Sequence, residues 1–413
     1  MPCDFRTPTP RPSATRLAVR VTAEALRGIR SGHPWVYENS ILSIKGEGVS
    51  GDLAVIFDDD RKFVAIGLYD PDSPIRIKIV HRGKPTTVDR AFWMGKLQTA
   101  LEFRSKLIER GDTTGYRCIN GENDEMPGIV LDHYAGTMVL KIYNAIWVPH
   151  LNDLVPAIND VFHPDALVLR HARNVEKALL HGLEEGDALL GTAPTEPVLF
   201  REAGLTFEAD VIRGQKTGYF LDQRENRVLV GTQAEGAKML DMFAATGGFT
   251  VHAAAGGATE VVAVDISEPT LSVAERNLQH NVSVPNVAAC KYRPMVGDAY
   301  EVLERLWRNG ERFDIVVIDP PSFTPRQTSV DRALASYAIL TEKAVRLVKP
   351  GGLYVQASCS SRVTADEFHL TVSHAAARAG RPLDEWRRTS HPVDHPIGFP
   401  QGAYLKAVFA RVP

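Results

Sequence analysis

The sequence has few cysteines: Cys3, Cys118, Cys290 and Cys359 are the four among 413 residues. None of them forms a C-x-x-C pair, and their wide spacing argues against a disulfide framework and against a structural zinc site. We therefore expect no metal centre and a reducing, cytoplasmic setting. Cys359 needs a separate explanation, because it follows a strand-like apolar run and stands between two serines.

The chain also lacks an excess of either charge and any long apolar run. Lys and Arg number 47 against 50 Asp and Glu, so the formal net charge of -3 gives no global attraction to an anionic partner. Residues 242–259 carry no charge, but His252 and four glycines interrupt them, which argues against a membrane span. Residues 1–15 contain four prolines and no apolar core, so they predict a disordered tail rather than an export signal.

A chain of this length predicts two to three domains. Residues 16–84 contain short apolar runs bounded by Gly, Asp and Pro, which indicate a small β-rich module. Residues 90–198 begin with an amphipathic helix over 90–111 and continue with strand-like runs, which predicts an α+β middle domain. In residues 200–413 apolar strands alternate with helices, which predicts an α/β domain whose parallel sheet binds ligands at the strands' carboxyl ends.

One local charge bias stands out near the N-terminus. Residues 1–35 hold six arginines against Asp4 and Glu24, a net charge of +4. This bias fits a phosphate-binding face, and it fits an ordinary solvated surface equally well.

The last domain carries a candidate cofactor site. Gly247 and Gly248 lie after a strand and at the start of a helix, where the absence of side chains lets a ligand approach the backbone. Asp265 ends the next strand, at the place where doubly wound folds put an acid on ribose hydroxyls. Asp298 precedes a further helix, which an ordinary N-cap would also explain.

The run "FDIVVIDPPSF" (313–323) is more specific. Asp319 follows a fully apolar strand, and Pro320 and Pro321 remove backbone donors and stiffen the exit from that strand. Simple strand termination rarely needs an Asp-Pro-Pro-x-aromatic sequence, so we expect a reactive or binding role for this segment.

Together these motifs resemble known families. "SGHPWVYENSI" (31–41) and "LYDPDSPIRIKIV" (68–80) resemble PUA domains at the front of RNA methyltransferases. The order from Asp241 through Gly-Gly, Asp265 and Asp298 to Asp-Pro-Pro resembles class I S-adenosylmethionine-dependent methyltransferases. Nearly the full chain is similar to RlmI-type 23S rRNA cytosine-5 methyltransferases.

The resemblance implies a Rossmann-like domain with a mostly parallel seven-stranded sheet, S-adenosylmethionine as cofactor, and 23S rRNA or a large-subunit precursor as partner. No membrane partner is implied, and a homodimer is left open. The implied cofactor-binding residues are Tyr219, Asp222, Gln223, Asp241, Phe243, Gly247, Gly248, Asp265, Asp298 and Asp319. The implied catalytic residues are Cys359 and Asp319, and the implied RNA-binding residues are Pro320, Pro321, Phe323, Arg16, Arg20 and Arg76.

Chemistry gives Cys359 its expected role. Cytosine C5 is a poor nucleophile until a thiolate adds to C6, so C5 methylation needs a cysteine beside the cofactor. The family resemblance further implies that the carboxyl group of Asp319 meets the cytosine edge at N3. The target base would have to leave its stack to enter the site.

Two other functions stay open at this point. Asp-Pro-Pro-x-aromatic also suits an exocyclic-amine N-methyltransferase, which has no need of Cys359. A non-catalytic RNA-binding assembly factor could keep the same fold. The chain also departs from the family pattern at Ser322 and Ser361, where lysine and glycine are frequent. These departures leave Cys359 intact, but the family's detailed RNA contacts and its target nucleotide are not carried over.

Overall fold

The computed structural model describes residues 9–323 and 330–413. The chain forms two compact units. Unit 1 consists of the chain up to Phe200 with Ala209–Tyr219 and Val393–Gly402, and unit 2 consists of Arg201–Glu208, Phe220–Pro392 and Ala403–Pro413. Two short segments from the C-terminal half of the sequence therefore belong to unit 1. No helix in the described ranges combines the length and the apolar character that a membrane crossing requires.

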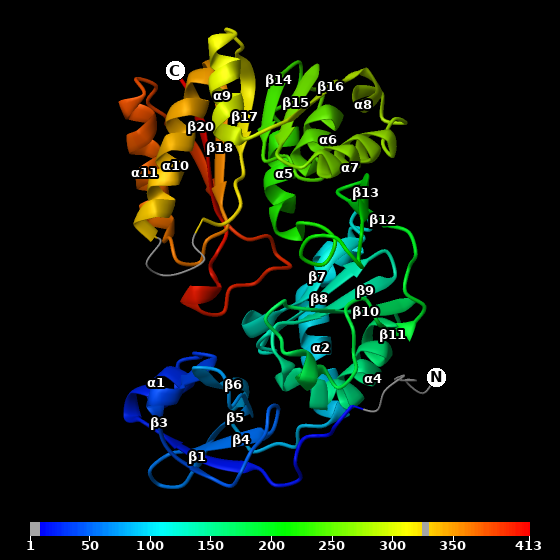
Figure 1. Cartoon of the computed structure of the whole chain (residues 1–413), viewed down its shortest axis with the longest axis vertical. Helices are drawn as coiled ribbons and strands as arrows, with labels where there is room; N and C mark the ends of the chain where they lie inside the picture. The colour runs from blue at the N-terminus through cyan, green and yellow to red at the C-terminus, as the bar shows by residue number, and fades with distance from the viewer. Residues whose placement is uncertain (1–8, 324–329) are drawn as a thin grey trace. The chain divides into compact units, whose positions relative to one another are not determined.

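Unit 1 begins with a six-stranded sheet in the order β2-β6-β5-β4-β1-β3 (Figure 1). Its strands are β1 (Leu17–Val21), β2 (Trp35–Tyr37), β3 (Ile41–Lys45), β4 (Leu53–Phe57), β5 (Phe63–Tyr69) and β6 (Ile75–Arg82), and helix α1 (Ala23–Arg30) follows β1. Strand β1 alternates buried and exposed side chains, and its buried residues pack with Leu26 and Ile29 of the helix. The expected β-rich module is confirmed.

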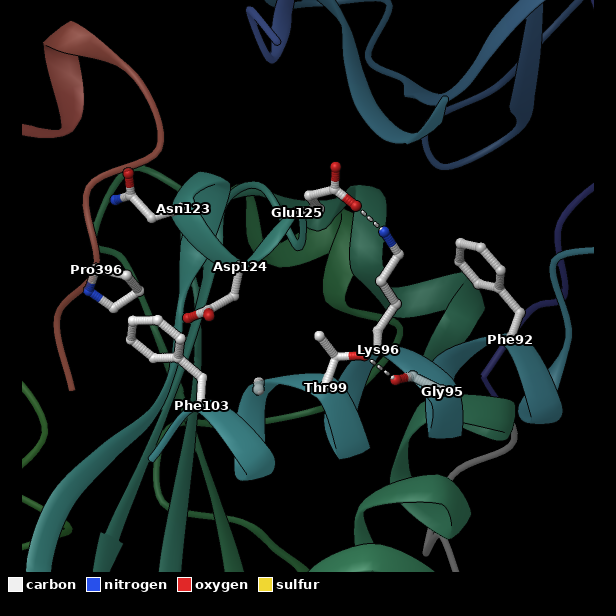
Figure 2. Close-up of a pocket in the computed structure, with 10 residues that line it drawn as sticks. Phe92, Gly95, Lys96, Thr99, Phe103, Asn123, Asp124, Glu125 and Pro396 are labelled. Atoms are coloured by element: carbon white, nitrogen blue, oxygen red, sulfur yellow. Dashed lines mark hydrogen bonds and ion pairs between the residues drawn. The ribbon is translucent and has the colours of Figure 1, made fainter. Parts of the chain in front are cut away.

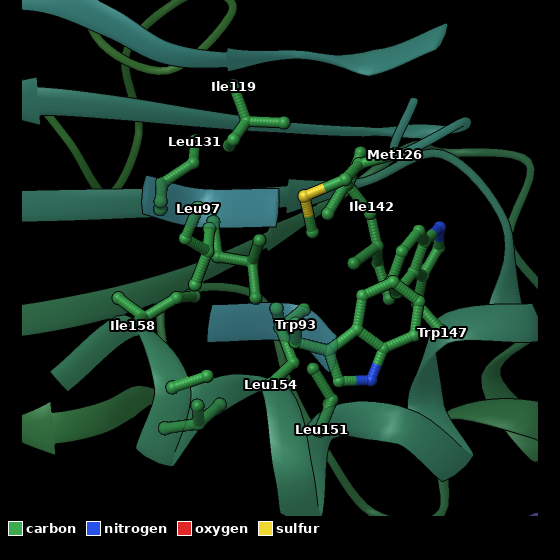
Figure 3. Packing of buried hydrophobic residues seen from close by; sticks show 14 of the residues in the cluster. Trp93, Leu97, Ile119, Met126, Leu131, Ile142, Trp147, Leu151, Leu154 and Ile158 are labelled. Atoms are coloured by element: carbon green, nitrogen blue, oxygen red, sulfur yellow. The ribbon is translucent and has the colours of Figure 1, made fainter. Parts of the chain in front are cut away.

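The rest of unit 1 is an α+β layer with a five-stranded sheet in the order β11-β10-β9-β8-β7. The strands are β7 (Gly115–Asn120), β8 (Ile129–Tyr134), β9 (Thr137–Ile142), β10 (Ala166–His171) and β11 (Ala188–Gly191), and the helices are α2 (Arg90–Phe103), α3 (Ser105–Glu109) and α4 (Leu151–Phe162). Figure 3 shows Trp93 and Leu97 of α2 packed with Trp147 and Leu154 in the core between helices and sheet.

The helix expected over residues 90–111 is divided in two at Arg104. The Arg104 side chain is fully buried, and its guanidinium donates to the carbonyl oxygen of Ala100 and to the carboxylate of Asp124. The Arg104 side chain contacts the acidic residue Asp124 instead of water. The periodicity of apolar residues alone does not reveal such a contact.

The predicted disordered tail needs a correction. Its first eight residues lie outside the described residues, but from Thr9 the chain is held by side-chain contacts. Asn152 donates to Thr9 Oγ1 at 2.8 Å, and Ser13 donates through both its backbone N–H and its hydroxyl to Asp52. Proline content alone did not reveal these partners, because they lie far away in the sequence.

Unit 2 contains the predicted seven-stranded sheet, in the order β16-β15-β14-β17-β18-β20-β19. Its strands are β14 (Lys238–Met242), β15 (Glu260–Asp265), β16 (Lys291–Val296), β17 (Phe313–Ile318), β18 (Val348–Ser358), β19 (Asp384–Thr389) and β20 (Lys406–Arg411). Strand β20 runs antiparallel to both of its neighbours, and the other pairs are parallel. A two-stranded hairpin of β12 (Val198–Glu202) and β13 (Leu205–Ala209) precedes this sheet.

Helices cover both faces of this sheet, as its apolar strands require (Figure 1). They are α5 (Arg224–Gly231), α6 (Gly248–Ala255), α7 (Glu268–Gln279), α8 (Pro285–Ala289), α9 (Ala299–Arg308), α10 (Val330–Ala344) and α11 (Ala365–Arg378). Helices α9, α10 and α11 share one core cluster with the strands, and α5 and α6 share the cluster on the opposite face. The α/β fold class is confirmed.

A buried ion pair ties helix α5 to the hairpin. Arg227 donates two hydrogen bonds to Glu202, at 2.7 and 2.5 Å, and His252 lies 3.1 Å from the same carboxylate. Burial alone would raise the pKa of Glu202, but the Arg227 guanidinium and His252 lower it to about 2. The carboxylate is therefore ionised in the interior and depends on these partners.

Replacing Arg227 by Met should be strongly destabilising, because it leaves the Glu202 carboxylate buried without its counter-charge. We expect the free energy of unfolding to fall by about 3–5 kcal/mol. Arg388→Met is the control, since Arg388 pairs with Glu385 on the surface, and it should cost about 0.5 kcal/mol or less. Urea unfolding of both variants measures the difference, and equal losses would contradict a special role for the buried pair.

Candidate active site at the carboxyl edge of the sheet

The sheet register brings the motif residues to one edge. Met242, Val264, Ile318 and Gln356 stand in one row across four parallel strands. Asp265 and Asp319 come directly after this row on their strands, and Cys359 comes three residues after Gln356. Residues far apart in the sequence therefore meet where open α/β sheets bind their ligands.

Asp319 is held by a relay of amide groups. Gln223 donates from Nε2 to Asp319 Oδ1 at 2.8 Å, and Asn226 donates from Nδ2 to Gln223 Oε1 at 2.6 Å. Thr389 in turn donates to Asn226 Oδ1 at 2.6 Å. Because the Gln223 carbonyl is occupied as an acceptor, its NH₂ group has to face the carboxyl group. Gln223 thus serves to orient Asp319, a role that the resemblance did not include.

Cys359 is half-buried, and both neighbouring serines are fixed. The Ser358 hydroxyl bonds to the Tyr337 hydroxyl at 2.8 Å, and Lys406 Nζ donates to the carbonyl oxygens of Ser360 and Val363. Burial raises the pKa of Tyr337 to about 12, and nearby Cys359 and Asp319 add to the rise. One tyrosine hydroxyl therefore lies within electrostatic range of both predicted catalytic residues.

The Asp-Pro-Pro segment has a mixed environment. Pro320 is buried, whereas Pro321 is exposed. The Phe323 ring is partly buried and stands edge-on to Tyr337, with ring centroids 5.2 Å apart. Phe323 thus contributes to the core beside the site, and a stacking role toward a nucleobase stays a prediction.

The turn after β14 has a strained backbone. Phe243, Ala245 and Gly247 adopt φ angles of +63°, +47° and +77°. A left-handed conformation costs a non-glycine residue about 1–2 kcal/mol, so other contacts must hold this turn. Asp265 provides one of them, because its carboxylate accepts the N–H of Ala245 at 3.0 Å and that of Ser267 at 2.9 Å.

Gly247 and Gly248 have a packing role beside the expected one. A Cβ atom at Gly247 would stand 2.6 Å from the Cβ of Ala274 on α7, and its φ of +77° disfavours any side chain. Gly248 is buried and begins α6, after Gly247 at the N-cap. A glycine at position 247 is thus needed for the close packing of this turn against α7, whether or not a ligand is bound.

Asp241 carries a buried oxygen that no other described residue satisfies. It is fully buried, and its Oδ2 accepts the Thr250 hydroxyl at 2.7 Å, while Oδ1 has no hydrogen-bond partner in the described part of the chain. Burial raises the pKa of Asp241 to about 6. A buried acceptor of this kind favours a cationic ligand group.

The other predicted cofactor residues have distinct partners. Asp222 is buried and accepts the Tyr404 hydroxyl at 3.0 Å. Asp298 is exposed and caps α9 by accepting the N–H groups of Tyr300 and Glu301. Tyr219 belongs to unit 1, where its ring packs on Phe200 at 5.1 Å. Contacts of all three with a cofactor stay predictions.

Two apolar residues beside the edge were missed from the sequence. Ile266 directly follows Asp265, and Val296 ends β16; their side chains are 76% and 51% exposed. Large apolar side chains left in water beside Asp265, the predicted ribose-binding residue, fit a flat heteroaromatic ring. An exposed apolar residue cannot be told from a buried one by its position in a strand pattern.

Comparison with known proteins identifies the family. A model of S-adenosylmethionine-dependent methyltransferases matches residues 146–411, and a model of PUA-like domains matches residues 19–82. A ribosomal RNA large subunit methyltransferase of Deinococcus radiodurans is 43% identical over 98% of this chain and 99% of its own length. Ribosomal RNA large subunit methyltransferase I of Pseudoalteromonas translucida is 33% identical over 96% of this chain and 99% of its own length.

The chain belongs to the S-adenosylmethionine-dependent methyltransferase family of ribosomal RNA large subunit methyltransferase I. Two solved chains have the same fold: one described as a candidate SAM-dependent methyltransferase of Streptococcus mutans, and a candidate methyltransferase, SMU.776, complexed with SAH. Their TM-scores are 0.80 and 0.81 at 20% identity, and each match covers 96% of this chain and 100% of the other.

The cofactor of this family is S-adenosylmethionine, and the residues present fit it. The unsatisfied Oδ1 of Asp241 suits the cationic amino group of the methionine part, and the Asp265 carboxylate suits the ribose hydroxyls. The apolar pair Ile266 and Val296 suits the adenine ring. These fits rest on charge and exposure at the edge of the sheet, and the individual contacts stay predictions.

The three arginines expected to bind RNA have unequal surroundings. Arg20 pairs with Asp59 at 2.8 Å, and both side chains are exposed; Arg16 donates to the Thr86 carbonyl at 3.3 Å. Arg76 is largely buried and pairs with Glu38. Arg16 and Arg20 are both exposed, and a surface pair such as Arg20–Asp59 is easily exchanged for a contact with a phosphate. RNA binding is therefore expected more from these two residues than from Arg76.

Unit 1 also contains a pocket of about 420 Å³, shown in Figure 2. Phe92, Lys96 and Phe103 line it from α2, and Asp124 and Glu125 line it from the opposite side. Lys96 points to Glu125 and forms an ion pair with it. No predicted site residue lines this pocket, and its charged groups do not favour a phosphate.

Replacing Asp265 by Ala should weaken S-adenosylmethionine binding at least tenfold, because the variant loses both the ribose acceptor and the tie to the strained turn. Isothermal titration calorimetry measures the Kd. Asp314→Ala is the matched control: Asp314 lies at the amino-terminal end of β17 and pairs with Lys349, so the Kd should stay unchanged. Equal affinity of the two variants would refute the assignment of Asp265.

Proposed function

We propose that this chain methylates C5 of a cytosine in 23S rRNA, with Cys359 as the covalent nucleophile. The observation that carries this proposal is a half-exposed thiol at the end of β18, next to the strand that ends in Asp319. The relatives' names support large-subunit ribosomal RNA as the substrate. A buried structural cysteine would not need fixed serines on both sides and an acid on the neighbouring strand.

The first step activates the cytosine ring. The Cys359 thiolate forms a bond to C6, and the electron pair displaced from the C5–C6 double bond moves through C4 to N3, which takes a proton from Asp319. Gln223 donates to Asp319 Oδ1 and so orients the carboxyl group that gives this proton. The product is an enamine with electron density at C5.

The second step forms the new bond. Bound S-adenosylmethionine supplies an electrophilic methyl group. Carbon C5 forms a bond to this methyl group as the sulfonium–carbon bond breaks, and the N3 proton returns to Asp319. A base then takes the C5 proton, the C6–sulfur bond breaks, and the thiolate of Cys359 is restored along with the aromatic ring.

The two other functions considered for this sequence make different demands. Methylation of an exocyclic amine uses the acceptors around Asp319 and leaves Cys359 without a task. An assembly factor needs neither Cys359 nor an oriented Asp319. In this chain, however, a relay of hydrogen bonds from Thr389 through Asn226 and Gln223 orients Asp319. That relay supports a catalytic role for the carboxyl group.

Cys359→Ala should lower methyl transfer by a factor of about 10³ or more while the Kd for S-adenosylmethionine stays unchanged. Transfer of a labelled methyl group to unmodified 23S rRNA measures turnover, and calorimetry measures the Kd. Cys290→Ala is the control, because Cys290 is also half-buried in unit 2 and should tolerate the change. Full activity of the Cys359 variant would favour the N-methyltransferase, and a wild-type chain that binds rRNA without transfer would favour the assembly factor.

The PUA-like domain should supply RNA affinity through Arg16 and Arg20. Reversing both charges to Glu should weaken rRNA binding across sequences and reduce the salt dependence of log K by about two, because each arginine is expected to neutralise one phosphate. Filter binding at several salt concentrations measures the slope. Arg388→Glu, an equally exposed arginine outside this domain, is the control, and an unchanged slope in the double variant would place RNA binding elsewhere.

A further inference from the structure

Lys406 is a buried lysine that the methyl-transfer chemistry above does not use. It is the first residue of β20 and pairs across the sheet with Ser358, the residue before the nucleophile. The residue is only 3% exposed. An ammonium group at such a place costs free energy unless an anion or several acceptors compensate for it.

The contacts of Lys406 surround the nucleophile's loop. Nζ donates to the carbonyl oxygen of Ser360 and, at 2.5 Å, to that of Val363. One residue before Cys359 is thus fixed by strand pairing with Lys406, and one residue after it is fixed by the Lys406 side chain. The thiol is carried on a segment that this lysine holds from both sides.

Titratable groups from separate elements of the described chain face this site. Cys359 at the end of β18 and Glu367 on α11 both act electrostatically on Lys406. Cys359 and Asp319, which follows β17, also act electrostatically on Tyr337 of α10. Burial lowers the pKa of Lys406 to about 8, although Cys359 and Glu367 both favour its charged form.

Glu367 is a weak counter-charge for Lys406. It is exposed to water, and its carboxylate accepts the backbone N–H and the hydroxyl of Thr364 in the capping box of α11. Water screens its charge, and the helix start already uses its lone pairs. Of the two anions that favour the charged form of Lys406 in the described chain, the thiolate of Cys359 is therefore the stronger candidate.

We propose that Lys406 is a positioning residue whose ammonium stabilises the thiolate of Cys359 and fixes the loop that presents it. The biological purpose of this pair rests on the proposed function, because only a covalent mechanism needs a thiolate here. The carbonyl contacts keep the ammonium in place when the thiolate is consumed in the bond to C6.

The test is alkylation of Cys359 by iodoacetamide between pH 6 and 10, without RNA, measured by mass spectrometry of its peptide. In Lys406→Met the midpoint of the pH profile should move upward, and the rate at pH 7 should fall about threefold. A tenfold loss of thiolate would be offset in part by the higher nucleophilicity of a more basic thiolate. Lys406→Arg keeps a cation and should stay within about twofold of the wild type.

Two controls separate this effect from structural damage. Tyr337→Phe removes the hydrogen bond to Ser358 without a change of charge at neutral pH, so it should not lower the pH 7 rate as Lys406→Met does. Lys343→Met makes the same change at a half-buried lysine that pairs with Glu304, and its Cys359 profile should match the wild type. An unchanged Cys359 profile in folded Lys406→Met would overturn the proposal.

A second measurement keeps Lys406 in place, in case Lys406→Met does not fold. In Cys359→Ala the loss of the thiolate should make Lys406 lose its proton at lower pH, because the interaction acts equally on both groups. Trace acetylation of Lys406, followed in its peptide as a function of pH, measures where the lysine loses its proton. An unchanged profile in Cys359→Ala would refute the interaction between the ammonium and the thiolate. Both measurements use the protein without RNA. They can therefore refute the Lys406–Cys359 interaction while loss of turnover in Cys359→Ala still supports the proposed function, and they can support the interaction even if Cys359→Ala keeps full turnover.

Discussion

The parallel pairing of β17 with β18 is the constraint on which the site depends. Ile318 stands opposite Gln356, so the strands deliver Asp319 and Cys359 to the same edge from positions 40 residues apart. A one-residue slip of either strand would reverse which side chains face each helix layer and would separate the acid from the thiol. The buried Val and Ile residues of both strands make such a slip costly.

The edge combines strain, burial and charge that the rest of unit 2 has to support. Phe243 and Ala245 are kept left-handed in a turn that Asp265 ties through the Ala245 N–H. Asp241 is desolvated beside it, and Lys406 is desolvated at the far side of β18. Each feature costs stability without a ligand, and each favours a charged or polar group of a cofactor, a base or a reacting thiol.

Much of this arrangement could be predicted from the sequence. Apolar strands alternating with helices predicted the sheet, and Asp265, Asp319 and Cys359 were expected at its carboxyl edge because each comes at the end of such a strand. The relay through Asn226 and Thr389 could not be found, because its members come from α5 and β19 and meet only in the folded chain. The contacts that hold Thr9, and those that divide the first long helix, likewise have no local signature.

The burial of Lys406 also could not be predicted from the sequence. A lysine at the start of an apolar strand is expected to be an exposed end residue, and only antiparallel pairing of β20 with β18 brings Lys406 opposite Ser358, next to Cys359. Similarly, the list of arginines expected to bind RNA does not distinguish Arg20, in an exposed pair, from the largely buried Arg76. The ion-pair partner of an arginine and its burial depend on the tertiary structure. The sequence alone therefore could not show which of these arginines is more accessible to RNA.

The most direct test of the central claim is to incubate the enzyme and S-adenosylmethionine with 23S rRNA that contains 5-fluorocytosine, where fluorine blocks the final loss from C5. Covalent addition predicts a stable protein–RNA adduct whose nuclease-digested peptide carries the nucleotide on Cys359. An adduct on another residue, or methylation of ordinary rRNA by an enzyme that forms no adduct with the fluorinated RNA, would contradict it.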